Sequence, residues 1–181
     1  MKNQLVKIIE NEEWLMTALR DVRGLYLPDW YIAAGAVRNT VWNSLHGRPG
    51  VENLKDIDVV YFDASDIEGK VGKEAEAFLK AKNPLPWEVV NQATAHLFNK
   101  RKQVYSSSES IAYWSETPTC VGVRMNEDDS LEICAPHGLY DLMNLIVRPI
   151  PEPYQNLTLY GHRIEQKQWE KTWPKLKILK K

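Results

Sequence analysis

The stretch Trp30-Tyr-Ile-Ala-Ala-Gly35-Ala-Val-Arg38, followed by Lys55-Asp56-Ile-Asp58-Val-Val-Tyr-Phe62, decides the fold of this chain. The first segment is an apolar run that leads into a glycine, and the second is an apolar run that carries two aspartates. Side chains two residues apart on a β-strand point to the same face, so Asp56 and Asp58 are expected to project together, about 6.5 Å apart along the strand. Two carboxylates on a buried strand are costly unless a cation lies between them. The pair therefore predicts a divalent-metal site, for which two Mg²⁺ ions are the usual arrangement in phosphoryl chemistry.

Length and composition place the chain among ordinary globular proteins. It has 181 residues, of which 44% are hydrophobic and 26% are charged, and it contains no low-complexity tract. We predict a single domain over residues 1–181, with an N-terminal helix within residues 1–25 and a C-terminal arm, residues 148–181, packed on it. The formal net charge of -1 excludes a global basic field that would attract nucleic acid, but not a local basic groove.

No segment predicts export or membrane insertion. The first residues mix charged and apolar side chains and lack the apolar core of a secretory signal. No run approaches the roughly 18–20 apolar residues that a membrane span requires. The two cysteines, Cys120 and Cys134, are too few for a disulfide framework. We therefore expect a cytoplasmic protein with no membrane partner.

The spacing of apolar residues predicts alternating helices and strands, followed by a hairpin. Residues 31–34 form either a short strand or the start of a helix, and residues 57–62 and 87–90 are typical of strands. The segments 119–124 and 131–134 flank a polar, turn-rich loop, which indicates a β-hairpin. The predicted fold class is α/β or α+β, a short mixed β-sheet with helices packed on it. Helices are expected over residues 3–22, 37–45, 66–81, 92–100, 106–114 and 138–145.

Three features are expected to act together at one site. Backbone N–H groups at the start of the 37–45 helix form an anion site, where Gly35 lets a phosphate approach closely. Arg38 adds a charge-assisted hydrogen bond. If the strand that carries Glu88 lies beside the strand of the two aspartates, Glu88 completes a carboxylate trio whose oxygens suit a divalent cation.

Each of these residues also has an ordinary interpretation. Gly35 is equally typical of a turn, and Arg38 of a solvated helix face. Glu88 can be a charge that protects an edge strand from aggregation. Asn91, at the end of the same strand, either contacts a substrate or caps the helix that follows it.

The order of glycine, helix, Asp-x-Asp strand, helix and acidic strand resembles the nucleotidyltransferase superfamily typified by DNA polymerase β. Gly35-Ala36 stands at the Gly-Gly or Gly-Ser position of that signature, Asp56-Ile-Asp58 at its aspartate pair, and Glu88 at its third acid. Ala36 departs from the usual second Gly or Ser, and the gap from Gly35 to Asp56 is longer than the common spacing. The loop 47–50 can absorb the extra length, because lengthening a loop costs little free energy.

A narrower resemblance covers residues 30–173 and joins the chain to a small bacterial family of largely uncharacterised nucleotidyltransferases. The segments that carry it are Ala34-Gly-Ala-Val-Arg-Asn-Thr-Val-Trp42, Asp56-Ile-Asp-Val-Val-Tyr-Phe-Asp63, Val90-Asn-Gln-Ala-Thr-Ala-His96, Thr119-Cys-Val-Gly-Val-Arg124 and Ala135-Pro-His-Gly-Leu-Tyr-Asp-Leu142.

The resemblance implies a metal-dependent enzyme that moves a nucleoside monophosphate from an NTP to an acceptor hydroxyl. Mg²⁺ or Mn²⁺ is then held by Asp56, Asp58 and Glu88, which are also the implied catalytic residues. The acceptor can be RNA, a protein or a small molecule, and the oligomeric state is open. The alternatives are a catalytically inactive nucleotide- or RNA-binding module and a regulatory interaction protein. The implied nucleotide-binding residues are Gly35, Ala36, Arg38 and Asn91.

Overall fold

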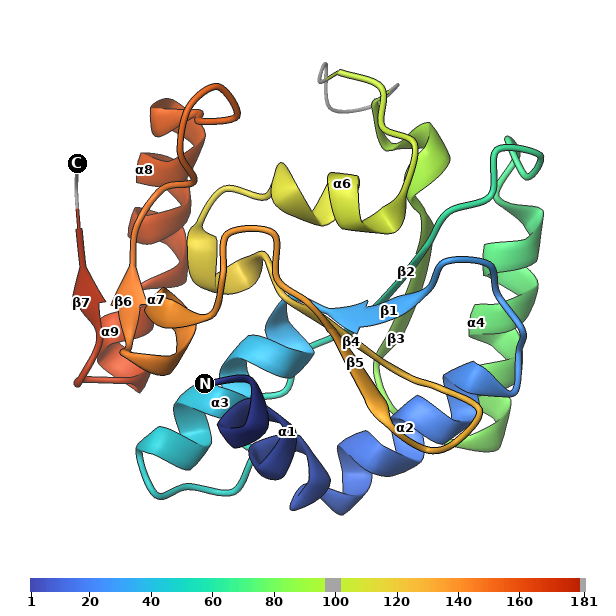
Figure 1. Cartoon of the computed structure of the whole chain (residues 1–181), viewed down its shortest axis with the longest axis horizontal. Helices are drawn as coiled ribbons and strands as arrows, with labels where there is room; N and C mark the ends of the chain where they lie inside the picture. Colours follow the sequence, from blue (N-terminus) through green and yellow to red (C-terminus); the bar gives the residue numbers. More distant parts are fainter. Residues whose placement is uncertain (97–101, 180–181) are drawn as a thin grey trace.

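A computed structural model describes residues 1–96 and 102–179 of the chain. A five-stranded sheet lies at its centre, with the strand order β3-β2-β1-β4-β5 (Figure 1). Strands β2 and β3 run parallel, whereas the pairs β1–β2, β1–β4 and β4–β5 are antiparallel. The predicted fold class, a mixed sheet with packed helices, is confirmed. The strands are β1 (Tyr31–Ala33), β2 (Ile57–Tyr61), β3 (Trp87–Asn91), β4 (Gly122–Met125) and β5 (Leu131–Cys134).

Helices lie on both sides of this sheet. Figure 1 shows α1, α2 and α3 gathered on one side and α6 on the other, with α8, α9 and a small parallel sheet of β6 and β7 at one end. These elements are α1 (Lys2–Glu10), α2 (Glu13–Arg23), α3 (Gly35–Leu45), α4 (Lys70–Lys82), the 3-10 helix η1 (Gln92–Thr94), α6 (Ser107–Ala112), the 3-10 helix η2 (Thr117–Thr119), α7 (Tyr140–Met143), β6 (Ile146–Val147), α8 (Leu157–Lys167), α9 (Trp169–Thr172) and β7 (Lys177–Ile178).

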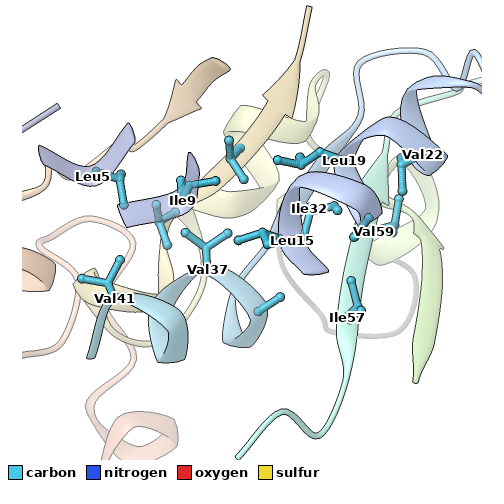
Figure 2. Close-up of a cluster of buried hydrophobic side chains, with 14 of the residues drawn as sticks. Leu5, Ile9, Leu15, Leu19, Val22, Ile32, Val37, Val41, Ile57 and Val59 are labelled. Carbon is cyan, nitrogen blue, oxygen red and sulfur yellow. The ribbon is translucent and has the colours of Figure 1, made fainter. Parts of the chain in front are cut away.

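The N-terminal segment forms two helices, so the prediction of one helix over residues 3–22 is wrong. Asn11 ends α1, and Glu12 has an extended backbone, φ −104° and ψ 92°, before α2 begins. The break lets both helices lay their apolar sides on one core, to which Leu5 of α1 and Leu15 of α2 belong (Figure 2). Asn11 followed by two glutamates is the sequence signal of this break, because Asn ends helices and acids favour their first turn.

Alternating side chains of the central strands build two separate apolar clusters. Ile32 and Val59 point into the large cluster beside α1, α2 and α3 (Figure 2). Tyr31 and Val60 point to the other face, where they join Ile111 of α6 in a smaller cluster. This follows from the two-residue period of a strand. Asp58 is in phase with Val60 and therefore lies on the face of the smaller cluster.

Several helices, α3 and α4 among them, begin at other positions than the apolar spacing predicted. Helix α3 begins at Gly35, two residues before the predicted start. Helix α4 begins at Lys70, after Gly69 in the left-handed conformation, and the Asp66 carboxylate accepts a hydrogen bond from the Lys70 N–H at 2.8 Å. Of the helix predicted for residues 92–100, residues 92–94 form η1, and residues 97–100 lie outside the described part.

The C-terminal segment packs against α3 through tryptophans. Trp42 of α3 meets Trp169 and Trp173 edge-on, with ring centroids 5.7 Å and 5.1 Å apart. The Trp173 indole N–H donates to the side-chain oxygen of Asn43 at 2.7 Å, and Asn43 is fully buried. Strand β7 then pairs with β6. These contacts fix the position of α8, which precedes them in the chain.

Candidate active site

Asp58 and Glu88 are neighbours on the uncovered part of the sheet. They are Cα partners in the parallel pair β2–β3, and Val60 and Val90 form a partner pair two residues further along. Parallel strands lie about 4.8 Å apart, and residues in register project to the same face. Glu88 is exposed and Val90 keeps 46% of its surface exposed, whereas the face at β1 is covered by Ile111.

A cleft of about 1300 Å³ opens over this part of the sheet. The floor of the cleft is the sheet, which contributes Asp58 and Val60 of β2 and Val90 of β3 to its lining. Further walls come from residues 113–115, which follow α6, and from the segment between residues 153 and 163. The cleft exceeds the roughly 300–1,000 Å³ of typical ligand pockets, so it has room for a nucleotide and part of a second molecule.

The turn between β1 and α3 brings a helix N-terminus to the carboxylates. Its N-cap residue, Ala34, lines the cleft and makes no side-chain cap hydrogen bond. A Cβ on Gly35 would lie 3.2 Å from the Oδ1 atom of Asp56, so the Asp56 carboxylate packs directly against the glycine backbone. Ala34 has φ 50° and ψ −121°, a conformation that strains a residue with a Cβ. The structure thus places Gly35 and Asp56 next to each other.

The three predicted carboxylates act on one another electrostatically. Burial, and then the negative charges of Asp56 and Glu88, raise the pKa of Asp58 to about 7, against the opposite effects of Arg38 and Lys167. A carboxyl group that is partly removed from water beside two like charges resists ionisation. In the part of the chain that the structure describes, no three His, Cys, Asp or Glu side chains converge into a ready-made metal site.

Arg38 lies inside the protein beside this site. Its guanidinium donates to the Thr119 hydroxyl at 2.5 Å and lies 3.8 Å from a carboxylate oxygen of Glu116. It also stacks against the rings of Trp42 and Trp169, at 5.0 Å and 4.6 Å from their centroids. Direct contact between Arg38 and a phosphate stays a prediction; the structure shows a buried cation whose positive charge acts on Asp58.

Asn91 has the capping role that the sequence left open. Its side-chain oxygen accepts from the N–H groups of Ala93 and Asp63, each at 3.1 Å. Its side-chain nitrogen donates to the carbonyl oxygens of Asp63 and Asp66, at 2.8 Å and 2.9 Å. Asn91 thus ties the end of β3 to the loop after β2. A direct contact with a nucleotide stays a prediction and would have to replace one of these four hydrogen bonds.

Comparison with known proteins identifies the family. A family model described as "Nucleotidyltransferase" matches residues 20–178. The chain belongs to this nucleotidyltransferase family. The resemblance drawn from its glycine turn and Asp-x-Asp strand is thereby confirmed.

Solved structures agree with this assignment. The nucleotidyltransferase is 32% identical to a protein whose NMR structure is described as revealing a CCA-adding enzyme head domain, with a TM-score of 0.87 over 99% of this chain and 96% of that one. A CCA-adding enzyme solved with CTP is 16% identical, with a TM-score of 0.63 over 98% of this chain and 43% of its own. A CCA-adding enzyme solved with ATP is also 16% identical, with a TM-score of 0.57 over 91% of this chain and 39% of its own. The chain spans less than half the length of these last two enzymes, and at this identity they show the fold alone. No curated protein matches the chain.

Two functional candidates of this nucleotidyltransferase escaped the sequence analysis, namely Glu116 and Arg163. Glu116 is fully buried, and it accepts hydrogen bonds from the Nε and Nη2 atoms of Arg163 at 3.1 Å and 3.0 Å and from the Thr119 hydroxyl at 2.7 Å. Arg163 lines the cleft from α8. The two residues are 47 positions apart, so no local spacing in the sequence could have indicated the pair.

Among the described residues, no helix is both long and apolar enough to cross a membrane.

Proposed function

We propose that this nucleotidyltransferase transfers a nucleoside monophosphate from an NTP to an acceptor hydroxyl and releases pyrophosphate. The observation that carries the proposal is the pairing of Asp58 with Glu88 beside a 1300 Å³ cleft that Asp58 lines. The start of α3 meets the third carboxylate of the trio, Asp56, at Gly35. Carboxylates beside a helix N-terminus combine a cation site with an anion site, which is what a metal-bound triphosphate requires. Membership in the family supports the same reaction.

The donor groups fit Mg²⁺ or Mn²⁺, since carboxylate oxygens are the ligands that hard divalent cations prefer. Burial, and after it the negative charges of Asp56 and Glu88, raise the pKa of Asp58, and Arg38 and Lys167 offset this only in part. Asp56, Asp58 and Glu88 are the residues that would hold the ion. When bound, the metal would activate the acceptor hydroxyl and neutralise charge on the leaving pyrophosphate.

The backbone at the start of α3 would hold the phosphates. The first N–H groups of a helix have no partner within the helix, and the helix dipole favours an anion there. Gly35 and Ala36 contribute these groups, and the missing side chain at Gly35 leaves room beside Asp56. Arg38 would add positive potential from its buried position, and Asn91 would keep the loop after β2 fixed at the same edge of the sheet.

An RNA end with a free hydroxyl is the first acceptor to test. The reason is the 32% identical structure, which is described as a CCA-adding enzyme head domain. The volume of the cleft is consistent with an acceptor end beside the NTP.

Pyrophosphate release from each of the four NTPs, with Mg²⁺ and a short RNA as acceptor, tests the proposal. We expect release by the native protein and its loss in the double variant Asp56→Asn/Asp58→Asn. Asp128→Asn, an exposed change of the same kind in the β4–β5 hairpin, should release pyrophosphate like the native protein.

Calorimetry of NTP binding with Mg²⁺ distinguishes the alternatives. NTP binding by the native protein without pyrophosphate release on RNA, protein or small-molecule acceptors would support an inactive binding module. Binding that is equal in the native protein and the double aspartate variant, or absent in both, would contradict the proposed site.

A further inference from the structure

We propose that Arg163 on α8 forms an anion subsite that binds phosphate groups, so that the C-terminal segment completes the cleft. The proposal rests on the proposed function only in naming the NTP as the molecule that carries these phosphates.

The hydrogen bonds of Arg163 leave one side of its guanidinium free. Its Nε and Nη2 atoms both donate to the Glu116 carboxylate, at 3.1 Å and 3.0 Å. Within residues 1–96 and 102–179, Nη1 has no hydrogen-bond partner. About 30% of the Arg163 side chain is exposed, and the residue lines the cleft that Asp58 also lines. A molecule in the cleft could accept from Nη1 without breaking the two hydrogen bonds to Glu116.

Among the described residues, Glu116 is the only carboxylate in direct contact with the guanidiniums of both Arg38 and Arg163. Asp56 and Asp58 act on Arg38 from the carboxylate side of the site. One fully buried carboxylate is shared by two guanidiniums, since Arg38 lies 3.8 Å from the oxygen that also accepts from Arg163. The trio of Arg38, Glu116 and Arg163 thus carries a net positive charge. Arg38 is almost fully buried, so the side of the trio that reaches the cleft is Arg163. A bound anion at Nη1 would neutralise the excess charge.

The guanidinium is held in a fixed orientation. Glu116, which fixes it, is itself bonded by the Thr119 hydroxyl at 2.7 Å, and the Arg163 guanidinium lies 6.0 Å from the ring centroid of Trp169. A guanidinium that is already ordered loses little side-chain entropy when it binds a ligand. Its planar pair of N–H donors matches the oxygens of a phosphate.

A purely structural role makes a different prediction. If Arg163 only neutralises Glu116, both residues stabilise the fold and neither changes anion affinity. If Arg163 binds phosphate, removal of its charge weakens anion binding. Glu116→Gln keeps a side-chain oxygen that can accept from Arg163 and so helps to orient it, but removes the negative charge and leaves a more positive site. The two substitutions therefore affect affinity in opposite directions only if the proposal holds.

Titration calorimetry with inorganic tripolyphosphate and Mg²⁺ tests the subsite in the full chain. Arg163→Gln should weaken binding by about tenfold or more, the usual effect of losing a charge-assisted hydrogen bond. Glu116→Gln should bind at least as tightly as the native protein at a temperature where thermal melting shows it to be folded. Arg20→Gln, the same change at an exposed residue of α2, should match the native protein within twofold.

Three results would overturn the proposal: no binding by the native protein, native affinity in Arg163→Gln, or a parallel loss in Arg163→Gln and Glu116→Gln. If Arg163→Gln does not fold, Arg163→Lys replaces it as the test. Lysine keeps the positive charge, but its single ammonium group cannot donate hydrogen bonds to Glu116 and to a phosphate in the geometry of the guanidinium. Its affinity should fall severalfold, and native affinity would overturn the proposal. Pyrophosphate release is not needed here, so this subsite and the proposed transfer reaction can fail separately.

Discussion

Asp58 and Glu88 are Cα partners on the neighbouring parallel strands β2 and β3. Their side chains therefore project to the same face of the sheet, and Asp56 acts on Asp58 as a further negative charge. Burial first, and then these like charges, disfavour the ionisation of Asp58. The metal-free fold holds this arrangement at a cost in free energy, which a bound cation would remove.

Asp58→Asn should stabilise the metal-free protein at pH 8. The pKa of Asp58 is about 7 in the folded state, against an ordinary value of 3.8, so between these values the folded state binds more protons than the unfolded state. Stability contributed by the protonated carboxyl is therefore lost as pH rises from about 4 to about 7. The side-chain amide of the variant does not ionise and therefore avoids this loss. We expect its free energy of unfolding to exceed that of the native protein by about 2 kcal/mol at pH 8 and by little at pH 4. Urea unfolding in EDTA at both pH values measures the difference.

With Mg²⁺ present, the native protein should be more stable than Asp58→Asn. Binding to the folded state alone raises the free energy of unfolding, and Asp58→Asn removes a ligand. Asp128→Asn, which changes an exposed loop carboxylate, should not gain stability at pH 8. A variant Asp58→Asn that is no more stable than the native protein in EDTA at pH 8 would show that the burial of the ionised Asp58 carboxylate beside like charges does not destabilise the fold.

Gly35→Ala should impair transfer while leaving the fold intact. The added Cβ would lie 3.2 Å from Oδ1 of Asp56, so the carboxylate has to move by a few tenths of an ångström. We expect transfer to fall about tenfold, because displacements of this order at a metal site disturb the reacting geometry. Gly161→Ala is the matched control, since a Cβ there would meet nothing within 4 Å. The control should keep native transfer and gain up to about 1 kcal/mol of stability, as alanine favours a helix.

The carboxylate pair could be predicted from the sequence because its signals are local. A near-continuous apolar run indicated β2, and the helix that separates β2 from β3 is the connection that parallel neighbours require. With β2 and β3 in parallel register, Glu88 reaches Asp58. The break at Asn11 was also readable, but the apolar spacing on either side of it is close enough to helical to conceal it.

The second charged cluster could not be predicted in this way. Glu116 and Arg163 are 47 positions apart and meet only because α8 folds back against η2. The burial of Arg38 has the same origin, since Trp169 and Thr119 come from distant segments that pack over α3. Long-range contacts of this kind depend on the whole packing arrangement, and no residue spacing records them.

Ala34→Gly should stabilise the protein. Ala34 has φ 50° and ψ −121°, a conformation that glycine adopts without the clash that a Cβ creates. Relief of this strain outweighs the greater entropy of glycine in the unfolded chain, and we expect a gain of about 1 kcal/mol. The neighbouring change Ala33→Gly, within β1 and without positive φ, should instead destabilise the protein. Equal losses for both variants in urea unfolding would show that the turn is not strained.

Trp173→Phe should destabilise the protein through a single lost hydrogen bond and some lost packing. The Trp173 indole N–H donates to the side-chain oxygen of Asn43 at 2.7 Å, and phenylalanine leaves that buried acceptor without its donor. An unsatisfied buried acceptor costs about 1–3 kcal/mol, to which the smaller ring adds a cavity.

Trp14→Phe separates these two contributions, since the Trp14 indole nitrogen is buried without a hydrogen-bond partner among the described residues. It therefore loses ring volume but no hydrogen bond. Urea unfolding should show a larger loss for Trp173→Phe than for Trp14→Phe. Equal losses would mean that the Asn43 bond does not help to anchor the C-terminal segment. In that case the contacts of Glu116 with Arg163 would have to hold α8 at the cleft.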